Sequence, residues 1–281
     1  MDEDQEVKPL DSSTPKLSYN IDELFSDARS QAKSKNLSCL LYGPPEAGKT
    51  FLALMFPGPL YVLDLDSGVG PNLKYVSSEK SVKKIDCISI DDDQENIDSV
   101  DYDPFRVRPM NTLKKIDHAI TVLQQIHGGT VIVDTITHVD QWLSALLNTE
   151  IPKQINEKGK EFTPIFDWKY VNSKYNWLME KLKNIDANLV LIARSKPIYI
   201  NGKPTDQEEM DARRGTDYHV SIAIHMTKEV SQGSDGKVIT KRISKFSKFR
   251  GNKLAKEYQE EDLTYDRIME ILNAPENTLV K

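Results

Sequence analysis

The sequence predicts an α/β fold in which a mostly parallel sheet is covered by helices on both faces, and three observations point to it. Short runs of Val, Ile and Leu recur along the chain with longer amphipathic segments between them, as expected for parallel strands that are buried on both faces. A glycine-rich turn joins the first apolar run to the first helical segment. After residue 194 the pattern changes to two strands around a turn, which predicts antiparallel strands added at the C-terminal edge of the sheet.

Each predicted element has a local signature. Strands are predicted where short apolar runs occur, over 38–42, 59–66, 84–90, 130–135 and 188–193. Helices are predicted from apolar side chains three and four residues apart, over 113–129, around 139–147 and over 166–182. In the last of these, one helical face favours core packing over base stacking, because it gathers Trp168, Val171, Tyr175, Leu178 and Leu182.

Composition limits the class of protein. The chain has 281 residues, a net charge of -6 and 38% hydrophobic residues, which is typical of a globular protein. No run approaches the ~18 apolar residues of a membrane span, so no membrane partner is expected. The acidic N-terminus lacks the apolar stretch of a signal peptide. Cys39 and Cys87 form no metal or disulfide pattern, so we expect two buried thiols in a reducing cytoplasm.

The segment GPPEAGKT fits the motif GxxxxGK[ST] and lies between a predicted strand and a predicted helix. In that context the motif predicts a loop whose backbone N–H groups cradle phosphate oxygens, aided by the dipole of the following helix. Lys49 would reach the β- and γ-phosphates, and the Thr50 hydroxyl would ligate Mg2+. The predicted nucleotide-binding residues are Gly43, Pro44, Pro45, Glu46, Ala47, Gly48, Lys49, Thr50 and Phe51.

A carboxylate at the end of a later strand supports this prediction. Asp134 ends the apolar run TVIVD, about eighty residues after the glycine-rich loop. A P-loop protein places at this point the carboxylate that holds the magnesium shell. We therefore expect the chain to bind ATP together with Mg2+, with Thr50 and Asp134 as the residues that hold the metal.

The order of these features resembles that of the RecA-like ATPases over roughly residues 36–256. VLDLDSGVGP (62–71) places Asp66 at the end of the strand after the P-loop helix, where that family carries an acidic catalytic residue, usually Glu. The resemblance implies a RecA-like P-loop core. Within the superfamily, the chain looks most like the compact ATPases of phages and archaeal mobile elements, which are associated with single-strand annealing and recombination.

The resemblance also implies roles for single residues. Asp66 would orient the attacking water, and Arg194 would sense the γ-phosphate. From the residues alone, Asp66 could instead cap a turn, and Arg194 could simply pair with an acid. The late K-x-R pair, Lys248 and Arg250, matches the basic pair that such ATPases insert into the site of a neighbouring subunit, which implies self-association into a ring or filament.

Charge and family position together predict the domain organisation. Residues 1–19 are expected to be a disordered acidic tail, 20–256 the RecA-like ATPase domain, and 257–281 a C-terminal helix and tail. Within the domain, 91–103 carries seven acids and no base and is expected to be an acidic insertion or loop.

The C-terminal quarter is the basic part of the chain. From residue 194 to 256 there are fourteen Lys/Arg against seven Asp/Glu, so an anionic partner would bind there. Two segments resemble the DNA-facing loops of RecA in position, 156–164 and 195–217. Lys203, Arg213 and Arg214 are predicted phosphate contacts. For the basic stretch 241–253, DNA contact and a merely solvated strand remain alternatives to the role in a neighbouring subunit.

These inferences predict a DNA-stimulated ATPase that acts on DNA, single-stranded by preference, as an oligomer in recombination, repair or replication. Two alternatives remain open. One is a nucleotide-dependent scaffold or switch with little turnover, which an Asp in place of the usual Glu at position 66 would favour. The other is a P-loop kinase of a small acceptor, although such enzymes carry a mobile arginine lid that this sequence does not show.

Overall fold

A computed structural model describes residues 36–87, 104–150, 154–155, 159, 161–162, 168–232, 238–249 and 258–274. They belong to one compact unit, Asn36–Lys281. The predicted tail (1–19), the acidic segment 91–103 and Arg250 lie outside the described residues.

Among the described residues, one nine-stranded sheet has the order β11–β10–β9–β1–β7–β4–β2–β3, with β8 paired to β7. The six strands from β9 to β3 in that order pair in parallel, and β8, β10 and β11 are antiparallel additions. The strands are β1 (Ser38–Gly43), β2 (Leu60–Asp64), β3 (Val82–Asp86), β4 (His127–Asp134), β7 (Asp186–Ile200), β8 (Lys203–Asp211), β9 (Ile222–Gln232), β10 (Val238–Phe249) and β11 (Gln259–Glu261).

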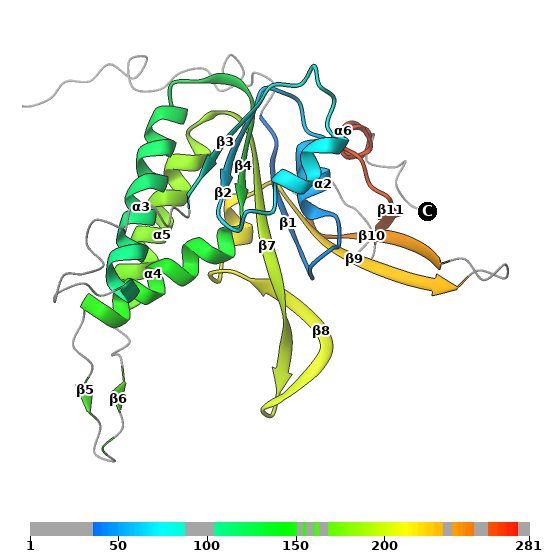
Figure 1. The fold of residues 1–281 in the computed structure, drawn as a ribbon. Coiled ribbons are helices and arrows are strands. Elements are labelled where there is room, and N and C mark those ends of the chain that lie inside the picture. The colour runs from blue at the N-terminus through cyan, green and yellow to red at the C-terminus, as the bar shows by residue number, and fades with distance from the viewer. Residues whose placement is uncertain are drawn as a thin grey trace, which may run out of the picture. The chain divides into compact units, whose positions relative to one another are not determined.

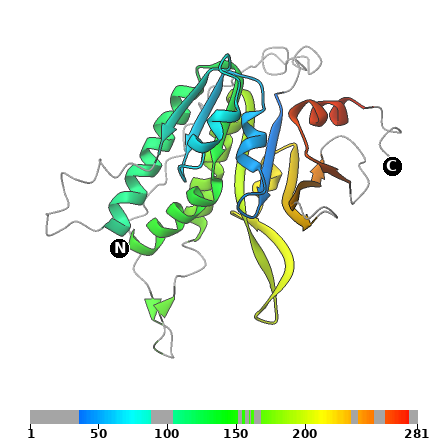
Figure 2. The same ribbon diagram turned by 45° about the vertical axis from the view of Figure 1, so that its right-hand side comes forward.

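Helices cover both faces of this sheet (Figures 1 and 2). One face packs against α3 (Pro104–Leu123), α4 (Ile136–Glu150) and α5 (Trp168–Lys183). The other face packs against α2 (Lys49–Leu54) and α6 (Tyr265–Asn273). The fold class predicted from the sequence is therefore confirmed, including the antiparallel strands at the C-terminal edge. The shorter elements are η1 (Gly70–Tyr75), η3 (Thr216–His219) and the pair β5 (Gln154–Ile155) with β6 (Glu161–Phe162).

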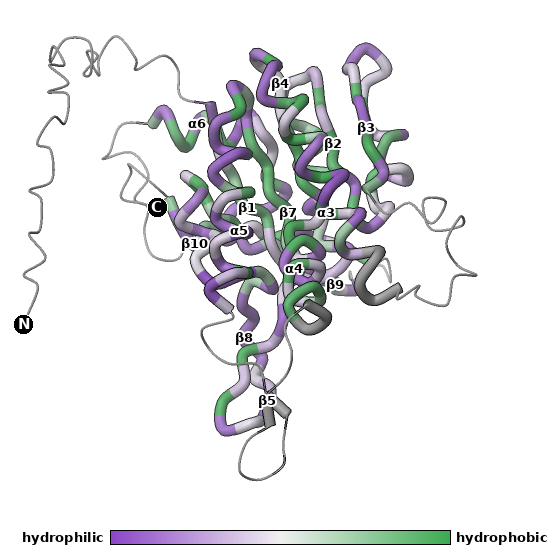
Figure 3. Tube along the Cα trace, turned by 90° about the vertical axis from the view of Figure 1, so that its left-hand side faces the viewer, coloured by the Kyte–Doolittle hydropathy of each residue, from purple (hydrophilic) through white to green (hydrophobic). Residues whose placement is uncertain are grey.

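The two cores follow from the alternation of side chains along each strand. In β1, Leu40 belongs to the core under α3–α5, whereas Cys39 and Leu41 belong to the core under α2 and α6. Figure 3 shows the resulting concentration of hydrophobic residues on the central strands. Cys39 and Cys87 are both buried free thiols, as predicted, and burial raises the pKa of Cys87 to about 12.

The structure corrects three sequence predictions. The segment 195–217, predicted to be a loop, is largely the hairpin of β7 and β8, which turns at Asn201 (φ 51) and Gly202 (φ 76). An Asn-Gly pair is a strong hairpin signal because both residues tolerate positive φ. The helix predicted over 113–129 is α3, which ends at Leu123, because the following glycine pair begins β4 instead of capping the helix. The third strand is β3 at 82–86, earlier than predicted.

Candidate nucleotide site

The loop between β1 and α2 has a backbone that requires its glycines. At Gly43 (φ 153), an added Cβ would lie 2.0 Å from the carbonyl oxygen of Met226 on β9. At Gly48 (φ 89), it would lie 2.7 Å from Cδ of Arg242 on β10. Strand pairing on one side and the left-handed backbone on the other therefore fix the path of the loop.

Lys49 is the first residue of α2 and is only 9% exposed. Its Nζ donates hydrogen bonds to the carbonyl oxygens of Gly43 at 2.8 Å and Pro44 at 2.7 Å. Burial lowers the pKa of Lys49, and the nearby carboxylates of Asp134 and Asp66 oppose this effect. The ammonium group is thus held inside the phosphate-binding loop by carbonyl oxygens that phosphate oxygens could replace.

Thr50 and Asp134 meet directly, as the predicted magnesium site requires. The Thr50 hydroxyl donates to Asp134 Oδ2 at 2.7 Å, and Asp134 is 2% exposed at the end of β4. Burial raises the pKa of Asp134 to about 7, although the hydrogen bond from Thr50 acts in the opposite direction. A hydroxyl and a carboxylate are the hard oxygen ligands that Mg2+ prefers, with phosphate oxygens and water completing the shell. This pair of residues therefore fits the metal.

Asp66 follows β2 and makes two contacts. Its Oδ1 accepts a hydrogen bond from the Gly68 N–H at 3.2 Å, and its Oδ2 lies 3.5 Å from Nη2 of Arg194. Asp66 thus accepts the hydrogen bond of a turn, and Arg194 pairs with an acid. Both alternatives left open by the sequence are seen in the structure. The same geometry places both side chains at the carboxyl edge of the sheet beside Asp134, where catalytic groups would stand.

A second acid of β2, Asp64, lies deeper in the sheet. Its side chain is fully buried, Oδ2 lies 3.4 Å from Nζ of Lys84, and Oδ1 has no hydrogen-bond partner within the described part of the chain. Asp64 is the register partner of Asp134 in the parallel pair of β2 and β4. A buried carboxylate oxygen without a hydrogen-bond partner among the described residues, next to the residue proposed to hold the metal, favours the binding of a positive ion there.

In the described part of the basic stretch, residues 241–249, the charged side chains have different kinds of contacts. Lys248 donates to the backbone oxygen of Asp217 and lies 5.1 Å above the ring of Tyr218, so it contacts its own chain. Lys241 pairs with Glu261 at 2.9 Å. Arg242 points to the other face of β10, against Gly48 and 5.7 Å from the ring centroid of Phe51.

The structure also places the residues predicted to contact DNA. Lys203 lies exposed at the turn of the β7–β8 hairpin, and Arg214 is exposed after β8. Arg213 is held by Asp140 at 2.5 Å, by Asn172 at 2.8 Å and by other groups on α4 and α5. Its charge therefore already has partners within the chain. In α5, the predicted core residues Val171, Tyr175, Leu178 and Leu182 are buried, and Trp168 is partly buried.

Sequence reasoning missed the residues that long-range pairing brings to this site. Glu208 of β8 accepts hydrogen bonds from Ser195 and His225, and Arg242 covers Gly48. None of these residues belongs to a short motif. The Asn-Gly turn could have located β8, but only the order of strands in the sheet shows that β8 lies beside the glycine-rich loop.

The fold and this geometry define a P-loop nucleotide-binding domain. A family model described as an AAA domain matches residues 35–248, which is most of the chain, and the chain belongs to this family. It is therefore an AAA-type P-loop ATPase domain. No curated protein matches the sequence significantly. Within the described residues, none of the helices is long and apolar enough to cross a membrane, and the cytoplasmic location stays a prediction.

Two solved structures with distant similarity are an ATPase and a helicase. One is an ATPase from the type III secretion system of pathogenic bacteria, with a TM-score of 0.38 and 10% identity over 68% of this chain and 52% of that one. Another is a DnaB-like replicative helicase, described with its interactions with primase, with a TM-score of 0.38 and 10% identity over 82% of this chain and 54% of that one. The chain thus spans about half the length of each. Scores this low carry no function from either protein to this chain.

Proposed function

We propose that the chain binds ATP with Mg2+ and hydrolyses it, and that it acts on DNA, single-stranded by preference, as an oligomer. The observation that carries the nucleotide part is the contact between Thr50 and Asp134 beside the buried Lys49. A hydroxyl, a carboxylate and an ammonium group converge on a loop whose backbone is preformed for phosphate. Supporting this, the chain belongs to the AAA domain family.

The residues of the site divide the work between them. Lys49 would exchange its two carbonyl partners for the β- and γ-phosphate oxygens. Thr50 and Asp134 would hold Mg2+, which neutralises phosphate charge when bound. Asp66 would accept the proton of the attacking water, a role that needs a carboxylate released from Arg194. Arg194 would in turn move to the γ-phosphate, so that one exchange of partners prepares both groups.

The contact between Asp66 and Arg194 also favours a second candidate function, a nucleotide-dependent switch with little turnover. A base that stays paired with a guanidinium group is a weak proton acceptor, because the positive charge stabilises the carboxylate. Turnover then depends on whether nucleotide binding breaks this pair. The two functions share one site and differ only in rate.

Support for DNA as the partner comes from the β7–β8 hairpin, whose strands carry Arg194 and Lys203. Figures 1 and 2 both show the hairpin extending beyond the body of the sheet. At its turn, Lys203 lies beside Tyr199 and Ile200, which are 63% and 58% exposed. Exposed aromatic and basic side chains together are typical of surfaces that bind single strands. Lys203 and Arg214 are the proposed phosphate contacts, and Arg213 would act mainly by holding α4, α5 and η3 together.

The oligomeric part of the proposal rests on Lys248 and Arg250. In an assembly, this pair would reach the γ-phosphate in the site of a neighbouring subunit, as an arginine finger does. Lys248 would then have to leave its part-buried hydrogen bond to the backbone oxygen of Asp217 and its contact with the ring of Tyr218.

The test is the rate of ATP hydrolysis by the full chain with Mg2+, measured alone, with a single-stranded oligonucleotide and with the matching duplex. We expect measurable hydrolysis, and stimulation that is larger with the single strand. The Lys203→Glu variant should lose stimulation while it keeps the basal rate. Tight ATP binding without turnover in any mixture would establish the switch instead, and turnover indifferent to both nucleic acids would exclude DNA as the activating partner.

A further inference from the structure

A third carboxylate lies beside the nucleotide site, contributed by β8. The strand β1 ends at Gly43, which is paired with Arg194 of β7. From Arg194 onward β7 pairs with β8 instead. β8 therefore continues the sheet in the place that β1 leaves when the chain turns into the phosphate-binding loop, and it contacts β1 there.

Glu208 is the residue of β8 that this arrangement turns toward the loop. Its Oε2 accepts hydrogen bonds from the Ser195 hydroxyl at 2.8 Å and from His225 Nε2 at 3.1 Å. The ring of His225 stacks on Tyr42, with centroids 4.9 Å apart and an interplanar angle of 17°. Tyr42 immediately precedes Gly43, whose carbonyl oxygen accepts the hydrogen bond from Lys49. A continuous set of contacts thus links Glu208 to the stem of the phosphate-binding loop.

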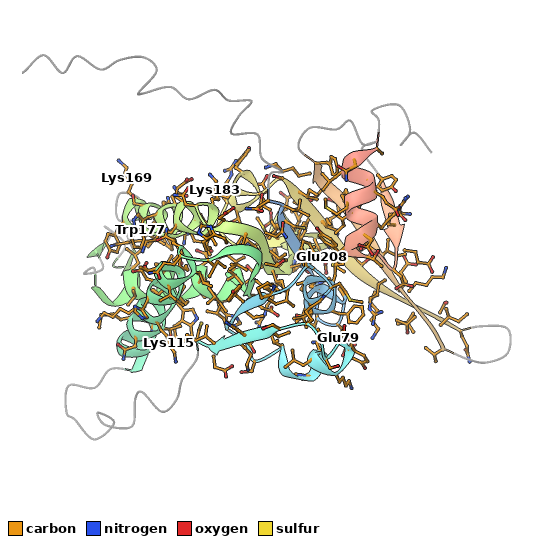
Figure 4. All side chains as sticks on the ribbon, turned by 90° about the horizontal axis from the view of Figure 1, so that it is seen from above. Glu79, Lys115, Lys169, Trp177, Lys183 and Glu208 are labelled. Atoms are coloured by element: carbon orange, nitrogen blue, oxygen red, sulfur yellow. The ribbon has the colours of Figure 1, made fainter. Side chains whose placement is uncertain are left out.

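The charges around Lys49 include the same residue. Burial lowers the pKa of Lys49, and three carboxylates oppose this effect, those of Asp134, Asp66 and Glu208. Asp134 belongs to the proposed magnesium site, and Asp66 is the proposed base for the attacking water. Glu208, which Figure 4 labels in the view from above, has neither role, and its strand β8 contacts β1 next to the loop. Ser195, which donates to Glu208, directly follows Arg194, the proposed γ-phosphate sensor, so the two charged residues come from the same stretch of the β7–β8 pair.

We propose that Glu208 is a positioning and specificity residue that weakens the binding of ATP relative to ADP. Its negative charge favours the arrangement in which Lys49 stays within the loop, and it repels the additional charge of the γ-phosphate. A triphosphate binds only after this repulsion is overcome, and loss of the γ-phosphate relieves it. The inference rests on the proposed function, since it requires that Lys49 binds nucleotide phosphates.

The test compares Glu208→Gln with wild type by calorimetric titration of ATP and of ADP, in EDTA so that no turnover occurs. Gln keeps the length of the side chain and an oxygen that accepts both hydrogen bonds, so only the charge changes. We expect the affinity for ATP relative to ADP to rise by about 5-fold, which is the scale of one partly screened charge. The shift should shrink at about 1 M salt, where exposed charges are screened.

The matched control is Glu209→Gln. Glu209 is the next residue of β8, points to the opposite face and lies 3.9 Å from Lys196, with its side chain 56% exposed. This variant should leave the ratio unchanged. Glu208→Ala, which removes the charge without keeping the acceptor, must shift the ratio in the same direction as Gln.

A Glu208→Gln protein that binds both nucleotides with the wild-type ratio overturns the inference alone, and leaves Glu208 as a structural link between β8 and β9. A shift that is insensitive to salt also overturns it, because a change in packing is not screened. A wild-type protein that binds neither nucleotide, in EDTA and also with Mg2+, overturns this inference and the proposed function together.

Discussion

The two sides of the nucleotide site are built in different ways. The side formed by β1, the loop and α2 comes from one stretch of sequence, and its groups are placed by local backbone geometry. The opposite side consists of Asp66 with Arg194, Glu208 and Arg242, which come from the end of β2, the β7–β8 hairpin and β10. The first side is preformed by glycines and a helix start. The second exists only because β7, β8, β9 and β10 adopt their order in the sheet.

This difference predicts where function tolerates change. A substitution in the local side removes a phosphate ligand that nothing else supplies. A substitution in the long-range side changes charge or orientation and leaves the phosphate cradle in place. We therefore expect the largest effects from the loop, intermediate effects from Asp66, and the smallest from residues that touch the loop from other strands.

Lys49→Ala should abolish ATP hydrolysis while the chain stays folded. The ammonium group is the only Lys or Arg side chain that donates into the loop carbonyls among the described residues, so its loss leaves the phosphates without that charge. The free energy of unfolding should change by less than about 2 kcal/mol, because two hydrogen bonds are lost but a buried charge is also removed. Steady-state hydrolysis and thermal unfolding are the measurements. Normal turnover would remove the loop from the mechanism.

The same variant tests whether the long-range side extends across subunits. A double variant with Lys248→Ala and Arg250→Ala keeps the site and lacks the basic pair. Each protein should be inactive alone, and an equal mixture should recover activity, because about a quarter of head-to-tail interfaces would join an intact site to an intact pair. A mixture that stays inactive, although wild-type subunits exchange with both variants, would show that the pair does not act across an interface.

Asp66→Asn should lower hydrolysis by about 10²-fold or more, the scale of a lost general base. ATP affinity should stay within a few-fold of wild type, because Asn still accepts from the Gly68 N–H and no phosphate ligand is removed. Single-turnover hydrolysis and equilibrium binding of ATP separate the two effects. Unchanged hydrolysis would leave Asp66 as a turn residue and direct attention to Asp64, whose buried Oδ1 has no partner within the described residues.

The same difference explains what the sequence could predict. The local side could be predicted because the motif GPPEAGKT specifies a phosphate-binding loop within one short segment. Asp134 could be predicted because it ends a strongly apolar strand. The predicted fold class followed from the same strands. Three other residues could not be predicted to lie at the site, namely Glu208, His225 and Arg242. Their position depends on which strands are neighbours in the sheet, and no short sequence motif determines that order. The β7–β8 hairpin was a different kind of miss, since its Asn-Gly turn was present in the sequence.

The smallest expected effect tests how far β10 takes part in the site. Arg242 lies against Gly48 and near Phe51, and its Nη1 is 3.9 Å from Asp262 Oδ1. Because backbone N–H groups at this helix start face the phosphates, the guanidinium group should add attraction from outside the loop.

Arg242→Gln should weaken ATP binding by about 3- to 10-fold, the scale of one partly screened charge. Lys241→Gln is the matched control, since Lys241 is the preceding residue of β10, faces the other way and pairs with Glu261. Equilibrium binding at low and high salt is the measurement. Equal effects of the two substitutions would mean that only the general charge of β10 matters, and the nucleotide site would then end at the strands that carry Arg194 and Glu208.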